Sequence, residues 1–160
     1  MKFVGAFVKL TICWICITIF LQFACVVSVS AQSIYTDSKQ NWSKLTTVKF
    51  EISEDDFGDI YIPVFDDNIL KMHGKVVTLK GYIIPFDGMF SPAHIMLSQM
   101  PVASCFFCGG AGPETVAEVY LSNPIAYTPD PVTVVGTLEL NAKNDEQLMY
   151  ILKNATLQHN

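Results

Sequence analysis

Two segments of the sequence share one alternating pattern, and this pattern constrains the fold more than any other feature. The segments are GKVVTLKGYIIP (74–85) and DPVTVVGTLELN (130–141). In each, apolar residues occupy every second position, and a glycine, Gly81 or Gly136, falls inside the β-branched run. Alternation with period two predicts strands. A glycine within such a strand predicts a tight coil where a small barrel turns its corner.

Three more segments have the length and composition of strands. They are AHIMLSQ (93–99), TVAEVYL (115–121) and MYILKNATL (149–157). With the first two segments they make five strands, which is the number in an oligonucleotide/oligosaccharide-binding (OB) barrel. We therefore expect a mainly β fold with a small OB-like five-stranded barrel over residues 71–158. A different small antiparallel barrel or sandwich is the alternative, because counting strands does not separate these folds.

Residues 32–70 are expected to form an N-terminal extension with a β-hairpin. TVKFEI (47–52) and DIYIPVF (59–65) both alternate, and three of the six residues between them are acidic. Two alternating runs joined by a short polar stretch are typical of a hairpin with a solvated loop. The extension would pack on the barrel.

One or two short helical turns are expected besides the strands. The stretch DDNILKMHG (66–74) predicts a turn that Asp66 or Asp67 caps and Gly74 ends. His73 lies at the end of this turn, where we interpret it as a helix residue rather than as a metal ligand.

The first 31 residues predict a secretory signal peptide. Two lysines precede an apolar run from Leu10 to Val29, and the small residues Val29 and Ala31 stand at the −3 and −1 positions of a cleavage site. We expect the mature chain to begin at Gln32 and to be extracytoplasmic, either periplasmic or secreted. An uncleaved anchor is the alternative, since about 20 apolar residues can span a bilayer. The protein would then meet the membrane through this segment.

The charge of the remaining chain disfavours nucleic acid as a partner. The sequence contains no arginine, and residues 32–160 carry eight lysines and fifteen acidic residues, a net charge of −7. Such a surface repels phosphate backbones. The roughly 129 residues are enough for one domain with a hydrophobic core. We therefore expect one domain that binds no nucleic acid, even though OB barrels often do.

Cys105 and Cys108 are the only cysteines that would remain after signal cleavage, because the other three lie within the first 31 residues. They fall in SCFFCGGAGPE (104–114), a segment rich in glycine. An exported chain enters an oxidising compartment. The pair can therefore hold a metal, exchange a disulfide or fix the loop with a structural disulfide, and the sequence leaves these three hypotheses open.

The chain resembles a family of functionally uncharacterised exported bacterial proteins with an OB-like barrel. The resemblance covers roughly residues 42–158, and its most specific part is SCFFCGGAGPE together with the preceding GYIIP (81–85). It implies a fold and an extracytoplasmic location, but no established activity.

A soft-metal site is the hypothesis that we favour for the two cysteines. Thiolates prefer zinc or copper(I) to hard cations, and zinc needs about four ligands. Candidates for the further ligands are His94 and Glu114, and we also considered Asp87 and His73.

The neighbouring residues are expected to shape and fill the loop. Gly109 and Gly110 would let backbone N–H groups approach the thiolates, and Pro113 would help to fix the turn. Phe106 and Phe107 would plug the mouth of the barrel, because aromatic residues are usually buried.

Dithiol exchange is the alternative, and the sequence supports it less. Activation of a cysteine needs a helix N-terminus or a nearby cation, and the glycines after Cys108 do not continue as a helix. No known catalytic motif occurs elsewhere. We therefore expect an exported, non-enzymatic protein whose cysteine loop binds a metal or contacts a protein partner in the cell envelope. The alternatives are a redox protein and a scaffold with a structural disulfide.

Overall fold

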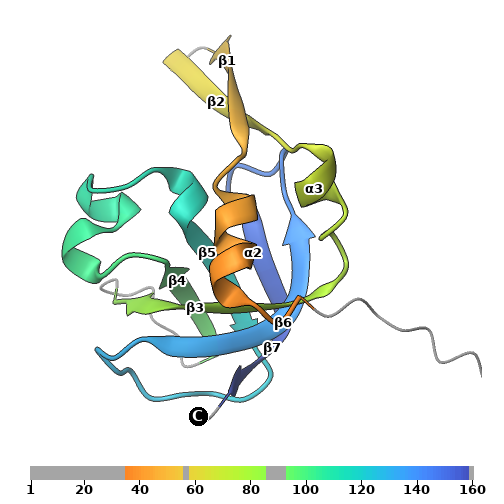
Figure 1. The fold of residues 1–160 in the computed structure, drawn as a ribbon. Coiled ribbons are helices and arrows are strands. Elements are labelled where there is room, and N and C mark those ends of the chain that lie inside the picture. Colours follow the sequence, from red (N-terminus) through yellow and green to blue (C-terminus); the bar gives the residue numbers. More distant parts are fainter. Residues whose placement is uncertain (1–34, 56–57, 86–92, 159–160) are drawn as a thin grey trace, which may run out of the picture. The chain divides into compact units, whose positions relative to one another are not determined.

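The structure is a computed structural model that describes residues 35–55, 58–85 and 93–158, all within one unit of the chain, Gln32–Asn160. Asp87, one of the metal ligands considered from the sequence, lies outside the described residues. Figure 1 shows a small barrel with a helix against it and a separate hairpin. In chain order the helices and strands are α2 (Ser38–Leu45), β1 (Lys49–Asp55), β2 (Gly58–Val64), α3 (Asp67–Leu70), β3 (Val76–Ile84), β4 (His94–Ser98), β5 (Val116–Leu121), β6 (Val132–Leu140) and β7 (Tyr150–Gln158).

Five strands form a closed barrel in the order β3-β4-β5-β7-β6, and β6 pairs back onto β3. The pair β5–β7 is parallel and the other four pairs are antiparallel. The five strands are the five that the alternating segments predict. The expected fold, a mainly β protein with a five-stranded barrel and an N-terminal hairpin, is therefore confirmed.

The two glycines of the repeated pattern lie where neighbouring strands approach closely. A Cβ atom at Gly81 would collide with the carbonyl oxygen of Ser98 on β4, and one at Gly136 would lie 2.9 Å from Cβ of Ala155 on β7. The register between β6 and β7 shifts between Val135 and Thr137, so Gly136 also marks an irregularity. Only glycine fits at such contacts.

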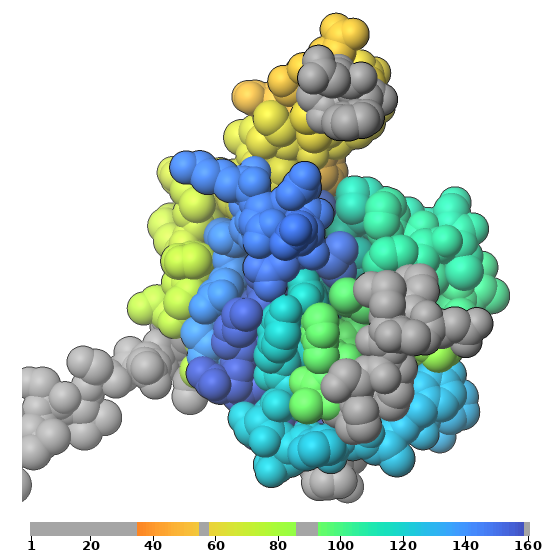
Figure 2. Space-filling view, turned by 180° about the vertical axis from the view of Figure 1, so that it is seen from behind, coloured from red at the N-terminus to blue at the C-terminus, as the bar shows by residue number. Residues whose placement is uncertain are grey.

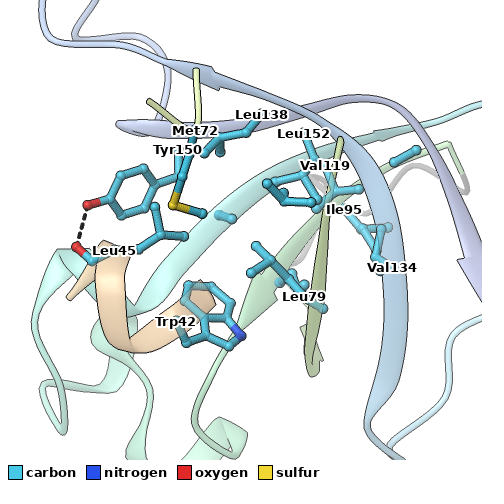
Figure 3. Close-up of a cluster of buried hydrophobic side chains, with 14 of the residues drawn as sticks. Trp42, Leu45, Met72, Leu79, Ile95, Val119, Val134, Leu138, Tyr150 and Leu152 are labelled. Carbon is cyan, nitrogen blue, oxygen red and sulfur yellow. Dashed lines mark hydrogen bonds between the residues drawn. The ribbon is translucent and has the colours of Figure 1, made fainter. Parts of the chain in front are cut away.

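The core fills the barrel and continues to α2. Figure 3 shows Trp42 and Leu45 of α2 facing apolar side chains from the strands. The phenol of Tyr150 donates a hydrogen bond of 2.6 Å to the carbonyl oxygen of Leu45. The large, fully buried side chains include Trp42, Tyr150, Leu45, Ile69, Met72, Leu79, Ile83, Leu97, Leu138 and Leu152.

Helix α2 is the element that the sequence analysis missed. Asp37 caps it by accepting a hydrogen bond from the backbone N–H of Gln40. Long-range bonds then tie it to β3. The Asn41 amide donates to the carbonyl oxygen of Thr78, at 2.9 Å, and the Trp42 indole donates to that of Lys80, also at 2.9 Å. The helix is therefore stabilised by the barrel more than by its own short sequence.

The expected hairpin and helical turn are both present. β1 and β2 form a two-stranded antiparallel sheet of their own. Asp66 caps α3, and the backbone N–H groups of Ile69 and Asn68 that donate to its carboxylate lower the pKa of that group. Gly74 has a φ of +71°, as a glycine that ends a turn requires. Among the described residues no helix is both long and apolar enough to cross a membrane.

Candidate functional site

The two cysteines lie in the connection between β4 and β5, residues 99–115, which we call the Cys loop. Three single 3₁₀ turns form much of it: Val102–Ser104, Phe106–Cys108 and Pro113–Thr115. Such short turns satisfy backbone groups without building a long element. The loop is therefore held by local backbone bonds.

Backbone hydrogen bonds fold the segment around the cysteines into a tight turn. The carbonyl oxygen of Cys105 accepts from the N–H groups of Cys108 and Gly110, each at 3.1 Å. The N–H of Gly109 donates to the carbonyl oxygen of Phe106 at 2.9 Å. The two glycine N–H groups thus bond to carbonyl oxygens, whereas the sequence analysis expected them to approach the thiolates.

The two glycines are needed for different reasons. Gly109 has a φ of +76°, in the left-handed region that favours glycine. Gly110 has no room for a side chain, because a Cβ atom there would lie 2.7 Å from the Cα and carbonyl oxygen of Ser104.

The two thiols are close together but differ in exposure. The Sγ atoms of Cys105 and Cys108 are 3.7 Å apart, and both cysteines are free. Cys105 is fully buried and Cys108 is exposed. The hydrogen bond between the two thiols raises the pKa of Cys108, and partial desolvation and the charge of a Cys105 thiolate act in the same direction. A raised pKa lowers the thiolate fraction of Cys108 at a given pH.

His94 lies at the far end of the β4–β5 pair from the Cys loop. The register pairs Ser98 with Val116 next to the loop and His94 with Tyr120 at the opposite end. The imidazole Nε2 of His94 lies 2.7 Å from a carboxylate oxygen of Glu118. The structure therefore places His94 with Glu118 rather than with the cysteines.

The other two ligands considered from the sequence also differ in position. Glu114 lies in the last turn of the Cys loop, on the side of the loop that joins β5. His73 accepts a hydrogen bond at Nδ1 from the backbone N–H of Leu140. Within residues 35–55, 58–85 and 93–158, no group of three or more His, Cys, Asp and Glu side chains is placed to hold a metal ion. Of the candidate ligands among the described residues, the structure brings Cys105 and Cys108 together.

Glu118 is a buried carboxylate that the sequence analysis did not consider. It is 3% exposed, and three donors surround it. One carboxylate oxygen is 2.7 Å from His94 Nε2 and accepts from the Tyr120 phenol at 2.7 Å. The other accepts from the backbone N–H of Leu148 at 3.2 Å, and Gln147 donates to the Tyr120 phenol. We call these five residues the Glu118 cluster.

The buried polar side-chain atoms of the Glu118 cluster all have hydrogen-bond partners. No described buried side-chain nitrogen or oxygen lacks a hydrogen-bond partner. The His94 and Tyr120 rings stack at 4.3 Å, and the Lys153 ammonium lies 3.8 Å from the Tyr120 ring centre. The hydrogen bond to Glu118 raises the pKa of Tyr120. The cluster thus attaches the β6–β7 loop to β5. The feature of the sequence that could have indicated it is Glu118 itself, an acidic residue inside an apolar strand.

The two phenylalanines do not plug the barrel, which corrects the expectation from the sequence. Phe106 is half-buried and Phe107 is 39% exposed. Cys105, in the same loop, is fully buried. The two rings meet edge to face at 5.1 Å. The two phenylalanines lie in a single 3₁₀ turn, Phe106–Cys108, and not in a strand whose register would direct them inward.

Phe106 instead lines an apolar groove between the Cys loop, the hairpin and the β6–β7 loop. Figure 2 shows these segments side by side, with the hairpin in yellow, the β6–β7 loop in blue and the Cys loop in green. The groove has a volume of about 620 Å³. It is lined by Phe50, Tyr61, Phe106, Pro113, Glu114 and Met149.

Comparison with known proteins gives one weak likeness. No protein-family model matches the sequence, and no curated protein matches it. A crystal structure of a DUF3299 family protein from Pseudomonas aeruginosa PAO1 is similar with a TM-score of 0.42 and 15% sequence identity, over 61% of this chain and 68% of that chain. A likeness of this size does not assign the chain to that family.

Proposed function

We propose that the protein is an exported, non-enzymatic binding protein that holds one soft metal ion, Zn²⁺ or Cu⁺, through Cys105 and Cys108. The observation that carries the proposal is the distance of 3.7 Å between the two free Sγ atoms. Two thiolates on a tetrahedral zinc ion, each bonded at about 2.3 Å, are about 3.8 Å apart. The thiols are therefore spaced for a shared ion before any metal is bound.

A zinc ion bound by the two thiolates alone would need further ligands from outside the described chain. The described part of the chain supplies two thiol ligands and no third. Because Cys108 is exposed, the open positions face solvent, where water or a side chain of an envelope protein partner can occupy them. This arrangement supports delivery or transient holding of an ion more than a closed structural site, which needs four protein ligands.

Dithiol exchange is supported less by the same geometry. A working dithiol needs one cysteine with a lowered pKa, whereas the contact with Cys105 raises the pKa of Cys108. The exposed thiol is thus not the activated cysteine that such a role needs. A metal ion changes this balance, because it displaces the proton on binding.

Metal titration of the reduced protein tests the proposal. Under anaerobic conditions the protein should bind about one Zn²⁺ or Cu⁺ per chain, measured by competition with a coloured chelator. Cys105→Ser and Cys108→Ser should each abolish binding, because each removes half of the soft donors.

His94→Ala and Glu114→Gln serve as the controls. His94→Ala should leave the metal affinity unchanged, because His94 lies at the other end of the β4–β5 pair. Glu114→Gln should also leave it unchanged, because no third ligand lies with the two thiols among the described residues. Absence of metal binding, together with one disulfide per chain in the isolated protein, would overturn the proposal in favour of a disulfide protein.

Export is a separate part of the proposal and has its own test. It rests on the two lysines, the apolar run and the small residues before Gln32. N-terminal sequencing of the protein recovered from the cell envelope should begin at Gln32. A chain that still begins at Met1 and needs detergent for extraction would contradict cleavage.

A further inference from the structure

The hairpin of β1 and β2 is a separate two-stranded sheet, so both of its strands are edge strands. One face carries Ile52 and Tyr61, which are register partners and are 65% and 61% exposed. The other face carries Ile60, Ile62 and Val64, all exposed as well. A hairpin alone is marginally stable in water, and contiguous exposed apolar side chains mark interaction sites. The hairpin therefore has the properties of a surface that a partner covers.

The register fixes which backbone groups point away from the hairpin. Antiparallel partners alternate between pairs that bond each other and pairs whose N–H and C=O groups point outward. Asp55 and Gly58 close a two-residue connection, so they are a hydrogen-bonded pair. Every second residue back from Asp55 is therefore also hydrogen-bonded within the hairpin. The residues between them, Phe50, Ile52 and Glu54, point their N–H and C=O groups to the outer edge of β1.

The outer edge of β2 is interrupted, and that of β1 is intact. Pro63 pairs with Phe50, so it holds an outward position, and it has no N–H to donate. A proline inside a sheet is placed with its nitrogen on the open side, which agrees with this assignment. Phe50, Ile52 and Glu54 make no backbone bond to described residues outside the hairpin. An intact edge of this kind is a template for another strand.

We propose that β1 pairs with β1 of a second copy of this chain, antiparallel and about a two-fold axis at Ile52. The two hairpins then form one four-stranded sheet. This register aligns all seven residues of each β1 strand. Ile52 then lies opposite the partner's Ile52, so the outward-pointing N–H and C=O groups of the two β1 strands can bond to each other. A two-fold pair of identical surfaces is the commonest arrangement of homo-oligomers.

Charge selects this register over its neighbours. With the axis at Ile52, Glu51 lies opposite the partner's Ser53, and Lys49 lies opposite the partner's Asp55. The smallest shift of one β1 strand along the other that still sets outward-pointing backbone groups opposite each other is two residues. In one direction it sets Glu51 opposite the partner's Glu51, and in the other opposite the partner's Asp55. Like charges directly opposite each other destabilise a strand pair.

The second copy also covers the most exposed side chain of the hairpin. Ile52 has the largest exposed fraction among the large apolar residues that are described. At the two-fold axis it packs against itself, and the joined sheet reaches the strand number at which a sheet becomes stable. This pairing uses neither cysteine, so it is independent of the proposed metal site.

A matched pair of proline variants tests the proposal. Ile52→Pro removes an outward N–H at the centre of the proposed interface. Tyr61→Pro makes the same change at the register partner of Ile52, on the edge that Pro63 already interrupts. Sedimentation equilibrium is run on the chain expressed from its full sequence and processed by the cell, with a reductant present and both with and without a chelator.

The wild-type protein should be a dimer whose dissociation depends on concentration. Ile52→Pro should raise the dissociation constant roughly tenfold or more, because the strand pair loses its central bonds and the Ile52 contact. Tyr61→Pro should leave it unchanged. Ile52→Lys, which sets two lysines opposite each other, should have the effect of Ile52→Pro and decides the matter if the proline variant does not fold. A monomer at all concentrations, a dimer that the chelator abolishes, or equal effects of Ile52→Pro and Tyr61→Pro would overturn the proposal.

Discussion

The two ends of the β4–β5 strand pair hold their polar side chains in opposite ways. At the His94 end, a buried carboxylate accepts from an imidazole, a phenol and a backbone N–H. At the Cys loop end, Cys108 is exposed, and its thiol contacts the thiol of Cys105. One strand pair thus carries a satisfied cluster at one end and an accessible dithiol at the other.

This difference separates structural from functional candidates in the domain. A titratable group whose hydrogen bonds are all made inside the fold contributes to stability, and a ligand would have to break those bonds first. A soft donor beside a second soft donor can bind an ion without such a cost. Residue type alone made His94 and Cys108 look alike as ligands, and their surroundings distinguish them.

The largest effect is expected at the Glu118 end. Glu118→Ala removes the acceptor of three hydrogen bonds and should lower the free energy of unfolding by about 3 kcal/mol. Glu118→Gln keeps the shape and one acceptor oxygen, so its cost should be smaller, about 1 kcal/mol. Urea denaturation measures both. A change below about 0.5 kcal/mol for Glu118→Ala, the size typical of ordinary surface sites, would contradict the structural role.

A smaller loss of stability is expected from the Cys loop, where the backbone rather than a polar cluster holds the structure. Gly110→Ala forces a Cβ atom against the backbone of Ser104 and should cost about 2 kcal/mol. Gly109→Ala has open space but a positive φ, so its cost should be about 1 kcal/mol. Urea denaturation gives the two values. If Gly109→Ala costs more than Gly110→Ala, the close approach at Ser104 is not what fixes the loop.

The fold was predictable because alternation repeats over many residues. Val77, Leu79 and Ile83 all face the core, as their spacing in the sequence indicates, and two glycines mark close contacts between strands. Helix α2 was not predictable, because its anchors, Asn41 and Trp42, bond to strand residues that are distant in the sequence.

The site was predictable only where its residues are neighbours in the sequence. The spacing of Cys105 and Cys108 was enough to bring the two thiols together. The position of His94 depends on the register of β4 with β5, which no local pattern gives. The same register and the path of a distant loop determine what surrounds Glu118.

Substitution of the two cysteines should change the free energy of unfolding by smaller and unequal amounts. Cys105→Ser places a hydroxyl in a fully buried position and should cost about 1 kcal/mol. Cys108→Ser lies at an exposed position, so its effect should stay within about 0.5 kcal/mol. Without denaturant, a thiol reagent should label Cys108 quickly and Cys105 slowly. Equal labelling rates in the two single variants would show that the loop opens as a unit.

The smallest effect on stability is expected at alkaline pH, where Tyr120 of the Glu118 cluster loses its proton. The hydrogen bond to Glu118 raises the pKa of Tyr120 above its usual value of 10.0. The unfolded chain then loses this proton at a lower pH than the folded protein does. The contribution to stability is therefore complete below about pH 10 and falls as the pH rises through the folded pKa.

Tyr120→Phe should remove this share of the pH dependence. The urea midpoint of the wild-type protein should fall as the pH rises above about 10, and the midpoint of Tyr120→Phe should fall less steeply. Part of the fall should persist in the variant, because burial raises the pKa of Tyr150 as well. Equal slopes for the two proteins would mean that Tyr120 is not coupled to Glu118 in solution. The contrast between the two ends of the β4–β5 pair would then rest on the exposure of Cys108 and not on a satisfied cluster around Glu118.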